Sequence, residues 1–188
     1  MDVVYLQPLK ELLQLSTYFK EELVVLVQNE SQESIVKKSG LIPCFVVSES
    51  TKDLNKIKSL KAVLGGSIKT NEFCARIKAD FLLQPSNTKQ FFDVGLAKKL
   101  SDNNTTVVFM LSDFIDKNSF EKHQFWKNYL EVAKHCRKKK TKLLVASGSK
   151  DPLLLRAPKV REAMAILLGL SKKEVAEGMK SIEKNKKY

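Results

Sequence analysis

Short apolar runs alternate with longer amphipathic stretches along this 188-residue chain, and that alternation limits the folds open to it. It is typical of repeated strand–helix units that build a mostly parallel sheet. The runs predict seven strands, at residues 3–6, 23–28, 44–48, 61–66, 80–84, 106–111 and 142–147. The stretches of helical period predict helices near 8–19, 31–38, 51–59, 70–78, 91–101, 118–138 and 158–168, with another opening after Ser171.

Seven such units favour a compact TIM-like β/α barrel, although an open doubly wound sheet has the same alternation. The chain is shorter than the ~250 residues typical of a TIM barrel, so its loops must be short or its barrel incomplete. We expect a single barrel domain over residues 1–182 and a basic C-terminal tail over residues 183–188.

Charge is the most informative feature of the composition. The chain has 33 basic and 21 acidic residues, a net charge of +12, which favours an anionic partner such as RNA, DNA or a membrane surface. Residues 1–100 carry 14 basic and 11 acidic side chains, whereas residues 101–188 carry 19 and 10. The excess positive charge therefore lies mainly in the second half.

Motifs for self-contained catalysis are missing from the sequence. It has no nucleotide-binding glycine loop, no nucleophile elbow, and only two histidines, His123 and His135, twelve residues apart on one predicted helix. The three cysteines form no C-x-x-C pair, and no apolar run approaches the ~20 residues that span a bilayer. We expect reduced thiols, a cytoplasmic location, and no metal, cofactor or catalytic residue in this chain.

The stretch LLLRAPKVREAMAILLGLSKKEV at 153–175 predicts a helix with charged residues at its start. Pro158 suits the first helical position, where its missing N–H costs nothing, and Gly169 suits the C-terminal cap. Ser171 and Glu174 form an S-x-x-E capping box for the last helix. Five apolar residues repeat at helical spacing, and we expect them to face the core: Val160, Ala163, Met164, Leu167 and Leu168.

Three cations around the start of this helix form the first candidate site. Arg156, Lys159 and Arg161 add positive charge beside first-turn N–H groups that have no partner within the helix, which suits a phosphate. Lys150, in the preceding loop, is a weaker candidate. In a barrel this loop would lie at the carboxyl end of a late strand, where phosphates are often bound. The alternative is that Arg156 pairs with Asp151 and only fixes the turn.

A second candidate site is the run KHCRKKKTK at 134–142, at the end of a predicted helix. Its best candidates for RNA contact are Lys138, Lys139 and Lys140. The alternative is a solvated helix end, since cations also suit the negative end of the helix dipole. Because no exposed aromatic platform is evident, structured RNA or a duplex backbone is the favoured target.

The run PLLLRAPKVREAMAILLGLSKKEVAEGMKS at 152–181 resembles the closing signature of ribonuclease P protein component 3. In that family a strand ending in small residues leads to Arg-x-Pro and then to a helix ending in a Leu-Gly-Leu-Ser-like turn. The segment at 80–115 is similar to the family's middle part, so the resemblance covers roughly residues 79–182. Leu154 stands where the family often has an acidic residue, which favours contact of Arg156 with RNA phosphate.

The resemblance implies a β/α barrel related to the metal-dependent phosphoesterase (PHP) barrels, without their metal ligands. It implies an RNA-binding, non-catalytic subunit of ribonuclease P. Ribonuclease P is an endonuclease whose RNA removes the 5′ leader from precursor tRNA by hydrolysis. The implied partners are ribonuclease P RNA, precursor tRNA, protein component 2 and other protein components, with no membrane.

Two rival functions stay open. One is a small barrel enzyme that binds a phosphorylated metabolite with the loop at 147–151 and the helix starting at 158. The other is a membrane-surface or scaffold protein.

Overall fold

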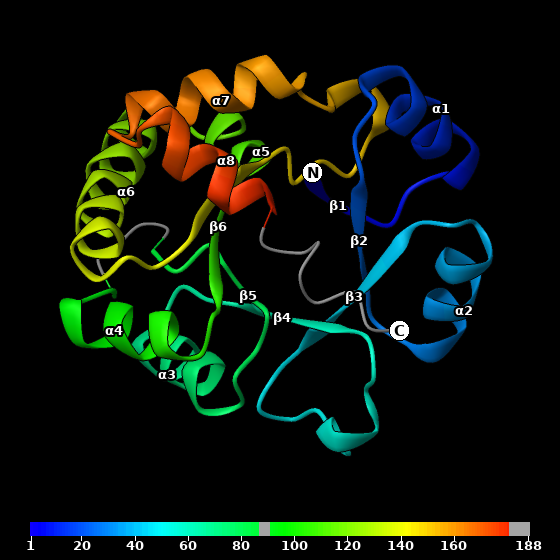
Figure 1. The fold of residues 1–188 in the computed structure, drawn as a ribbon, viewed down its shortest axis with the longest axis horizontal. Helices are drawn as coiled ribbons and strands as arrows, with labels where there is room; N and C mark the ends of the chain where they lie inside the picture. Colours follow the sequence, from blue (N-terminus) through cyan, green and yellow to red (C-terminus); the bar gives the residue numbers. More distant parts are fainter. Residues whose placement is uncertain (87–90, 181–188) are drawn as a thin grey trace.

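The computed structural model describes residues 1–86 and 91–180, and its seven strands pair in chain order, all of them parallel (Figure 1). Each lies where an apolar run predicted a strand. The strands are β1 (Asp2–Tyr5), β2 (Leu23–Val27), β3 (Ile42–Val47), β4 (Leu60–Leu64), β5 (Phe81–Leu83), β6 (Thr106–Met110) and β7 (Leu143–Ala146).

The sheet curves into a nearly closed barrel, and the segment after β7 meets β1. The N–H of Gly148 donates to the carbonyl of Val3 at 3.0 Å, and the N–H of Tyr5 donates to the carbonyl of Ser149 at 3.1 Å. Gly148 has φ +60°, and a Cβ there would lie 2.5 Å from Cβ of Met110. Glycine is therefore required where the chain leaves β7 and closes the barrel.

Both faces of the strands are buried, which explains why the runs are continuously apolar rather than alternating. One set of side chains fills the barrel interior, and the other packs beneath the surrounding helices. The interior set is Val3, Val24, Leu26, Cys44, Leu60, Ala62, Phe81, Leu83, Val108, Met110, Leu144 and Ala146.

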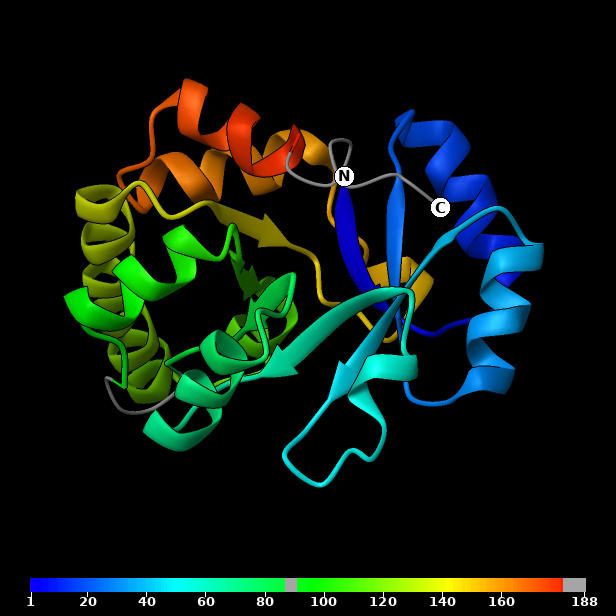
Figure 2. The ribbon, with the colours of Figure 1, turned by 60° about the horizontal axis from the view of Figure 1, so that its bottom comes forward.

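The helices surround the barrel (Figures 1 and 2). They are α1 (Leu9–Phe19), α2 (Glu30–Lys38), α3 (Ile68–Arg76), α4 (Val94–Asp102), α5 (Leu111–Ile115), α6 (Ser119–Lys139), α7 (Pro158–Leu167) and α8 (Lys172–Lys180), with 3-10 turns η1 (Leu54–Lys56) and η2 (Pro152–Leu154). The predicted start of α7 at Pro158 is confirmed, as is the capping box of α8, in which the N–H of Glu174 donates to Oγ of Ser171 at 3.2 Å. The predicted tail at 183–188 lies outside the described residues.

The helix predicted at 51–59 is wrong, because only the single turn η1 forms there. Asp53 has φ 57°, which interrupts a right-handed helix, and only Leu54 and Ile57 of this polar segment pack against the core. The segment has too few apolar side chains to hold a full helix against the sheet. The sequence did not predict the short helix α5.

The predicted inner face of α7 is wrong in part: Leu168 is buried and Met164 packs against the core as predicted, but Val160, Ala163 and Leu167 are exposed. Val160 and Leu167 are 47% and 64% exposed, whereas the buried positions of the helix are Arg161 and Ala165, followed by Leu168 at its end. These three residues also have helical spacing, so periodicity alone does not choose between the two faces. The orientation of α7 is set by the side chain of Arg161, which is buried and paired with Asp2 and Glu21.

Candidate nucleic-acid interface

The two basic clusters lie at opposite ends of the barrel. Lys138, Lys139 and Lys140 end α6 and precede β7, so they lie at the amino end of the parallel strands. Lys150 and Arg156 follow β7 and therefore lie at the carboxyl end of the strands. The chain can be followed from α6 through β7 to η2 in Figure 2. The clusters thus form two separate surfaces.

Arg156 is half-buried beside a pocket at the carboxyl end of the barrel. Its N–H donates to Oγ of Ser147 at 2.9 Å, which fixes the backbone near the end of β7. The pocket has a volume of about 250 Å³, and its polar lining comprises Ser112, Asp113, Asp116, Ser149, Lys150, Asp151 and Arg156. Nζ of Lys150 lies 5.1 Å from the ring centroid of Tyr5, a cation–π contact.

Arg156 does not form the ion pair with Asp151 that was its alternative role. Asp151 caps η2 by accepting a hydrogen bond from the N–H of Leu153 at 2.9 Å. Among residues 1–86 and 91–180, no ion pair within 4.0 Å involves Arg156. Its guanidinium group therefore keeps its charge available at the edge of the pocket.

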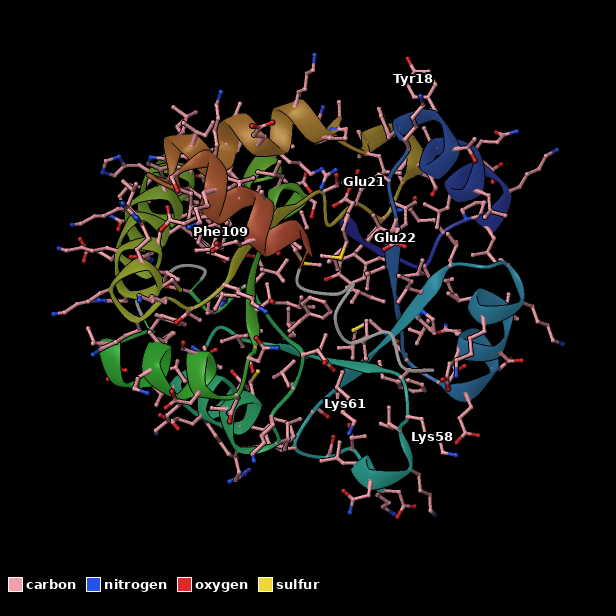
Figure 3. All side chains as sticks on the ribbon, in the orientation of Figure 1. Tyr18, Glu21, Glu22, Lys58, Lys61 and Phe109 are labelled. Atoms are coloured by element: carbon pink, nitrogen blue, oxygen red, sulfur yellow. The ribbon has the colours of Figure 1, made fainter. Side chains whose placement is uncertain are left out.

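Arg161 does not belong to this exposed surface, and the predicted contact of its side chain with RNA is wrong because the side chain is buried. Its side chain is 0% exposed and lies 3.6 Å from Oδ1 of Asp2 and within hydrogen-bonding distance of Glu21. It also donates from Nη1 to the carbonyl of Met1 at 2.8 Å and from Nε to the carbonyl of Arg156 at 3.2 Å. Arg161 therefore ties α7 to the start of β1 and to the turn after α1, where Figure 3 labels Glu21.

Burial and the guanidinium group act in opposite directions on the two carboxyl groups. Burial raises the pKa of Asp2, although the charge of Arg161 and the N–H of Ser147 act to lower it. Burial also acts to raise the pKa of Glu21, but the hydrogen bond and charge of Arg161, with the amino group of Met1, leave the pKa below its ordinary value. The hydrogen bond and charge of Arg161 therefore favour the ionised form of Glu21.

The amino end presents an open basic groove between the end of α6 and the start of α8. Lys138 and Lys140 are exposed and Lys139 is half-buried. The groove has a volume of about 380 Å³, and its charged lining comprises Arg137, Lys140, Lys142, Lys173, Glu174 and Glu177. One of its carboxylates is engaged, because Oε1 of Glu174 lies 3.3 Å from Nε of Arg137.

Four lysines at this end were not singled out from the sequence. Lys142 and Lys173 line the groove, and Lys58 and Lys61 lie at the start of β4, labelled in Figure 3. Nζ of Lys142 donates to Oδ1 of Asn104 at 2.7 Å. Lys142 was visible within the basic run at 134–142, but Lys173 joins the groove only because α8 packs against β7.

Buried polar groups at the carboxyl end bind one another. Nε2 of Gln84 donates to the carbonyl of Met110 at 3.1 Å and to Oδ2 of Asp113 at 2.6 Å, while its Oε1 accepts a hydrogen bond from the hydroxyl of Tyr129. Burial raises the pKa of Tyr129, with Asp113 adding to the effect. This network joins β5, β6 and α6 and therefore has a structural role.

The described residues contain no group of three or more His, Cys, Asp or Glu side chains placed to hold a metal ion. His123 and His135 both lie on α6. The three cysteines are free and buried, and burial, with a smaller contribution from Asp80, raises the pKa of Cys74 to about 12. Within the part of the chain that the structure describes, no helix is long and apolar enough to cross a membrane.

Comparison with known proteins gives the family. The sequence model of the RNase P subunit p30 family matches residues 28–185. The chain belongs to the RNase P subunit p30 family. Its match begins about 50 residues before the part in which the resemblance was apparent from motifs, so β3 and β4 are included. No curated protein matches the sequence.

Solved structures share the barrel at low sequence identity. A chain in the cryo-EM structure of archaeal ribonuclease P with mature tRNA has a TM-score of 0.82 and 15% identity, covering 97% of this p30-family chain and 88% of that chain. The crystal structure of the Arabidopsis N6-mAMP deaminase MAPDA has a TM-score of 0.52 and 13% identity, covering 85% and 52%. The predicted TIM-like barrel and the predicted assignment to a ribonuclease P protein subunit are confirmed.

Proposed function

We propose that this p30-family subunit binds RNA through two basic surfaces and leaves the cleavage of precursor tRNA to the ribonuclease P RNA. The carboxyl-end surface consists of Lys150, Arg156 and Lys159. The amino-end surface consists of Lys138, Lys139 and Lys140, with the groove beside them. The observation that carries the proposal is the half-buried Arg156, which forms no ion pair among the described residues despite three carboxylates lining the same pocket.

Placing the two surfaces at opposite ends of a rigid barrel has a consequence for RNA binding. Parallel strands fix the distance between the surfaces, so the subunit contacts two separate RNA segments at a set spacing. Phosphate contacts position RNA without reading its sequence. The subunit thereby stabilises the active conformation of the ribonuclease P RNA and supports the binding of precursor tRNA.

The proposed partners follow from the same interpretation. They are ribonuclease P RNA, precursor tRNA, protein component 2 and other protein components. The proposed location is the cytoplasm.

Salt dependence tests the proposal. We expect the affinity of the chain for ribonuclease P RNA to fall by about 10³ or more between roughly 50 and 200 mM monovalent salt, because several bound phosphates release their counterions. Filter binding or fluorescence anisotropy at five salt concentrations measures the slope of log K against log salt. A flat slope would contradict phosphate neutralisation by this chain.

The pocket beside Arg156 supports one rival, an enzyme for a phosphorylated metabolite. Its volume of about 250 Å³ accommodates a small molecule, and Lys150 and Arg156 lie in its lining. Asp113, Asp116 and Asp151 line the same pocket, however, and repel an anion that enters it fully. An RNA phosphate that contacts Arg156 from the rim avoids this repulsion, which favours the RNA-binding function.

A further inference from the structure

A further concentration of positive charge lies on the side of the barrel between β3 and β5. Residues 49–78 contain seven basic and three acidic side chains, whereas the rest of residues 1–100 contains seven and eight. The net positive charge of the first half therefore comes wholly from this segment. We call its seven cations the side surface: Lys52, Lys56, Lys58, Lys61, Lys69, Arg76 and Lys78.

Two parts of the chain lie side by side to form this surface. The crossover from β3 to β4 lies against α3, because Oε2 of Glu49 is 2.6 Å from Nζ of Lys69 and Oε1 is 3.8 Å from Nη2 of Arg76. The N–H of Lys61 donates to Oδ2 of Asp80 at 2.9 Å, which holds the start of β4 beside the start of β5. In Figure 1 this side of the barrel lies across from α7. In the sheet, β5 and β6 separate β4 from β7, whose ends carry the other two basic surfaces.

The carboxylates of the segment do not neutralise the side surface. Asp53 is paired with Lys56 at 2.9 Å, with side-chain exposures of 64% and 76%. An ion pair this exposed contributes little, so Lys56 can exchange the carboxylate for a phosphate. Glu49 is shared by two cations of α3, and Glu72 is paired at 2.8 Å with Lys99 of α4, outside the surface. The side surface therefore keeps a surplus of positive charge.

Lys52 and Lys58 have the most available charge of the set. Both are exposed, and neither forms an ion pair within 4.0 Å among the described residues. They flank η1, the single turn in a crossover where a full helix was expected. Only Leu54 and Ile57 of this crossover pack against the core, and lysines occupy much of the rest. Departures of this kind from local structural rules are expected at functional sites.

The composition of the side surface favours RNA over a protein partner. Protein interfaces are depleted of lysine, and six of these seven cations are lysines. Within residues 49–61 no large hydrophobic side chain is exposed, so an apolar interface core is missing there. Phe73, the one aromatic residue of the segment, is buried and cannot stack on an unpaired base. Contacts of lysine with the phosphates of a paired RNA segment need neither feature.

We propose that the side surface binds the phosphate backbone of a double-helical segment of ribonuclease P RNA, different from the segments bound at the two ends of the barrel. This inference rests on the proposed function, since it requires that the chain binds this RNA. It adds a third contact on another side of the same barrel. The subunit thereby restrains the relative positions of three RNA segments rather than two.

Charge reversal tests the side surface. Lys52→Glu with Lys58→Glu is compared with Lys10→Glu with Lys127→Glu, which changes the net charge equally at exposed positions on α1 and α6. We expect the side-surface pair to weaken binding to ribonuclease P RNA by about tenfold or more, with a smaller slope of log K against log salt. The control pair should change the affinity much less. Circular dichroism verifies that both variants are folded.

Directed hydroxyl-radical probing identifies the RNA segment and needs only single substitutions. Lys56→Cys, Lys138→Cys and Lys150→Cys are made separately, and each carries a tethered iron–EDTA group in the enzyme assembled from its RNA and protein components. The three native cysteines are buried and therefore contribute little background. We expect the probe at Lys56→Cys to cleave both strands of a paired segment that the other two probes leave intact.

Several outcomes would overturn the inference and leave the proposed function intact. One is a loss of affinity in the side-surface pair no greater than in the control pair. Another is an active enzyme in which the probe at Lys56→Cys cleaves no RNA, or cleaves only unpaired RNA. Protection of Lys56→Cys from maleimide by the protein components alone, or by anionic lipid vesicles, would assign the surface to that occupant instead. An affinity of the unsubstituted chain for the RNA that does not depend on salt would contradict the proposed function itself.

Discussion

Replacing Arg161 with alanine should lower the free energy of unfolding by about 3–5 kcal/mol, the range observed when one partner of a buried ion pair is removed. The substitution leaves Asp2 and Glu21 buried without their guanidinium partner, at side-chain exposures of 1% and 6%. It also removes the hydrogen bond to the carbonyl of Met1, which ties α7 to β1. Urea denaturation followed by circular dichroism measures the change.

Two further variants separate the role of Arg161 from a general loss of charge. Lys159→Ala removes an exposed cation two residues away and should change the free energy of unfolding by less than about 0.5 kcal/mol. Arg161→Lys keeps the charge but lacks the planar fork that reaches several acceptors at once, so its effect should lie between the other two. Equal stability of Arg161→Ala and Lys159→Ala would contradict the structural role of Arg161.

The stability difference between wild type and Arg161→Ala should depend on pH in a defined direction. Because the folded-state pKa of Glu21 lies below its ordinary value of 4.5, its contribution is present above that value. It is lost as the pH falls through the folded-state pKa. The charge of Arg161 also acts to lower the pKa of Asp2, so removing it raises that pKa further, and protonation of Asp2 at low pH relieves the variant more than the wild type. The difference should therefore be largest at neutral pH and should narrow on acidification.

Reversing charge on either basic surface should weaken binding to ribonuclease P RNA by about tenfold or more, and the salt slope should fall by about one for each phosphate that the variant no longer neutralises. Lys150→Glu with Arg156→Glu tests the carboxyl end. Lys138→Glu, Lys139→Glu and Lys140→Glu together test the amino end. Because the surfaces lie at opposite ends of the barrel, their effects on the free energy of binding should add when combined.

A matched control distinguishes specific surfaces from net charge. Lys10→Glu with Lys127→Glu changes the net charge as much as the carboxyl-end pair does, at exposed positions on α1 and α6 outside both surfaces. The control pair should reduce affinity much less than Lys150→Glu with Arg156→Glu. Equal losses would mean that RNA binding follows overall charge and that Arg156 has no particular role.

Most of the fold was predictable because local sequence and global structure agree. Each barrel strand is buried on both faces, so its run is almost wholly apolar, and each parallel pair needs a crossover, which spaces the runs evenly. The N-terminal ends of α7 and α8 were predictable from Pro158 and from the Ser171–Glu174 capping box, which are local signals. The segment at 51–59 failed because charged and polar residues there suit a solvated turn as well as a helix.

The orientation of α7 could not be predicted from the sequence. Two sets of residues on this helix have the spacing of a buried face, and the choice between them depends on Glu21, which lies 140 residues from Arg161 along the chain. For the same reason Arg161 was expected on the RNA-binding surface. Arg161 lies close to Arg156 and Lys159 in sequence, but in the folded helix its side chain points into the protein.

The candidate site was predictable as a set of basic clusters but not as an arrangement. The local density of lysine and arginine identified both clusters. Their places at opposite ends of the barrel follow from the parallel pairing of β7, the strand between them, which the sequence alone does not give. Lys173 was missed because it joins Arg137 and Lys140 through the packing of α8 at the end of the barrel. No local signal in the sequence brings those residues together.

Cleavage of precursor tRNA by ribonuclease P assembled from its RNA and protein components, with and without this chain, tests the function most directly. The RNA should be indispensable for removal of the 5′ leader, omission of the chain should lower the rate and the salt tolerance of the reaction, and the chain alone should cut nothing. Cleavage by the chain without RNA, or an unchanged rate and salt tolerance without the chain, would contradict its role as an RNA-binding subunit.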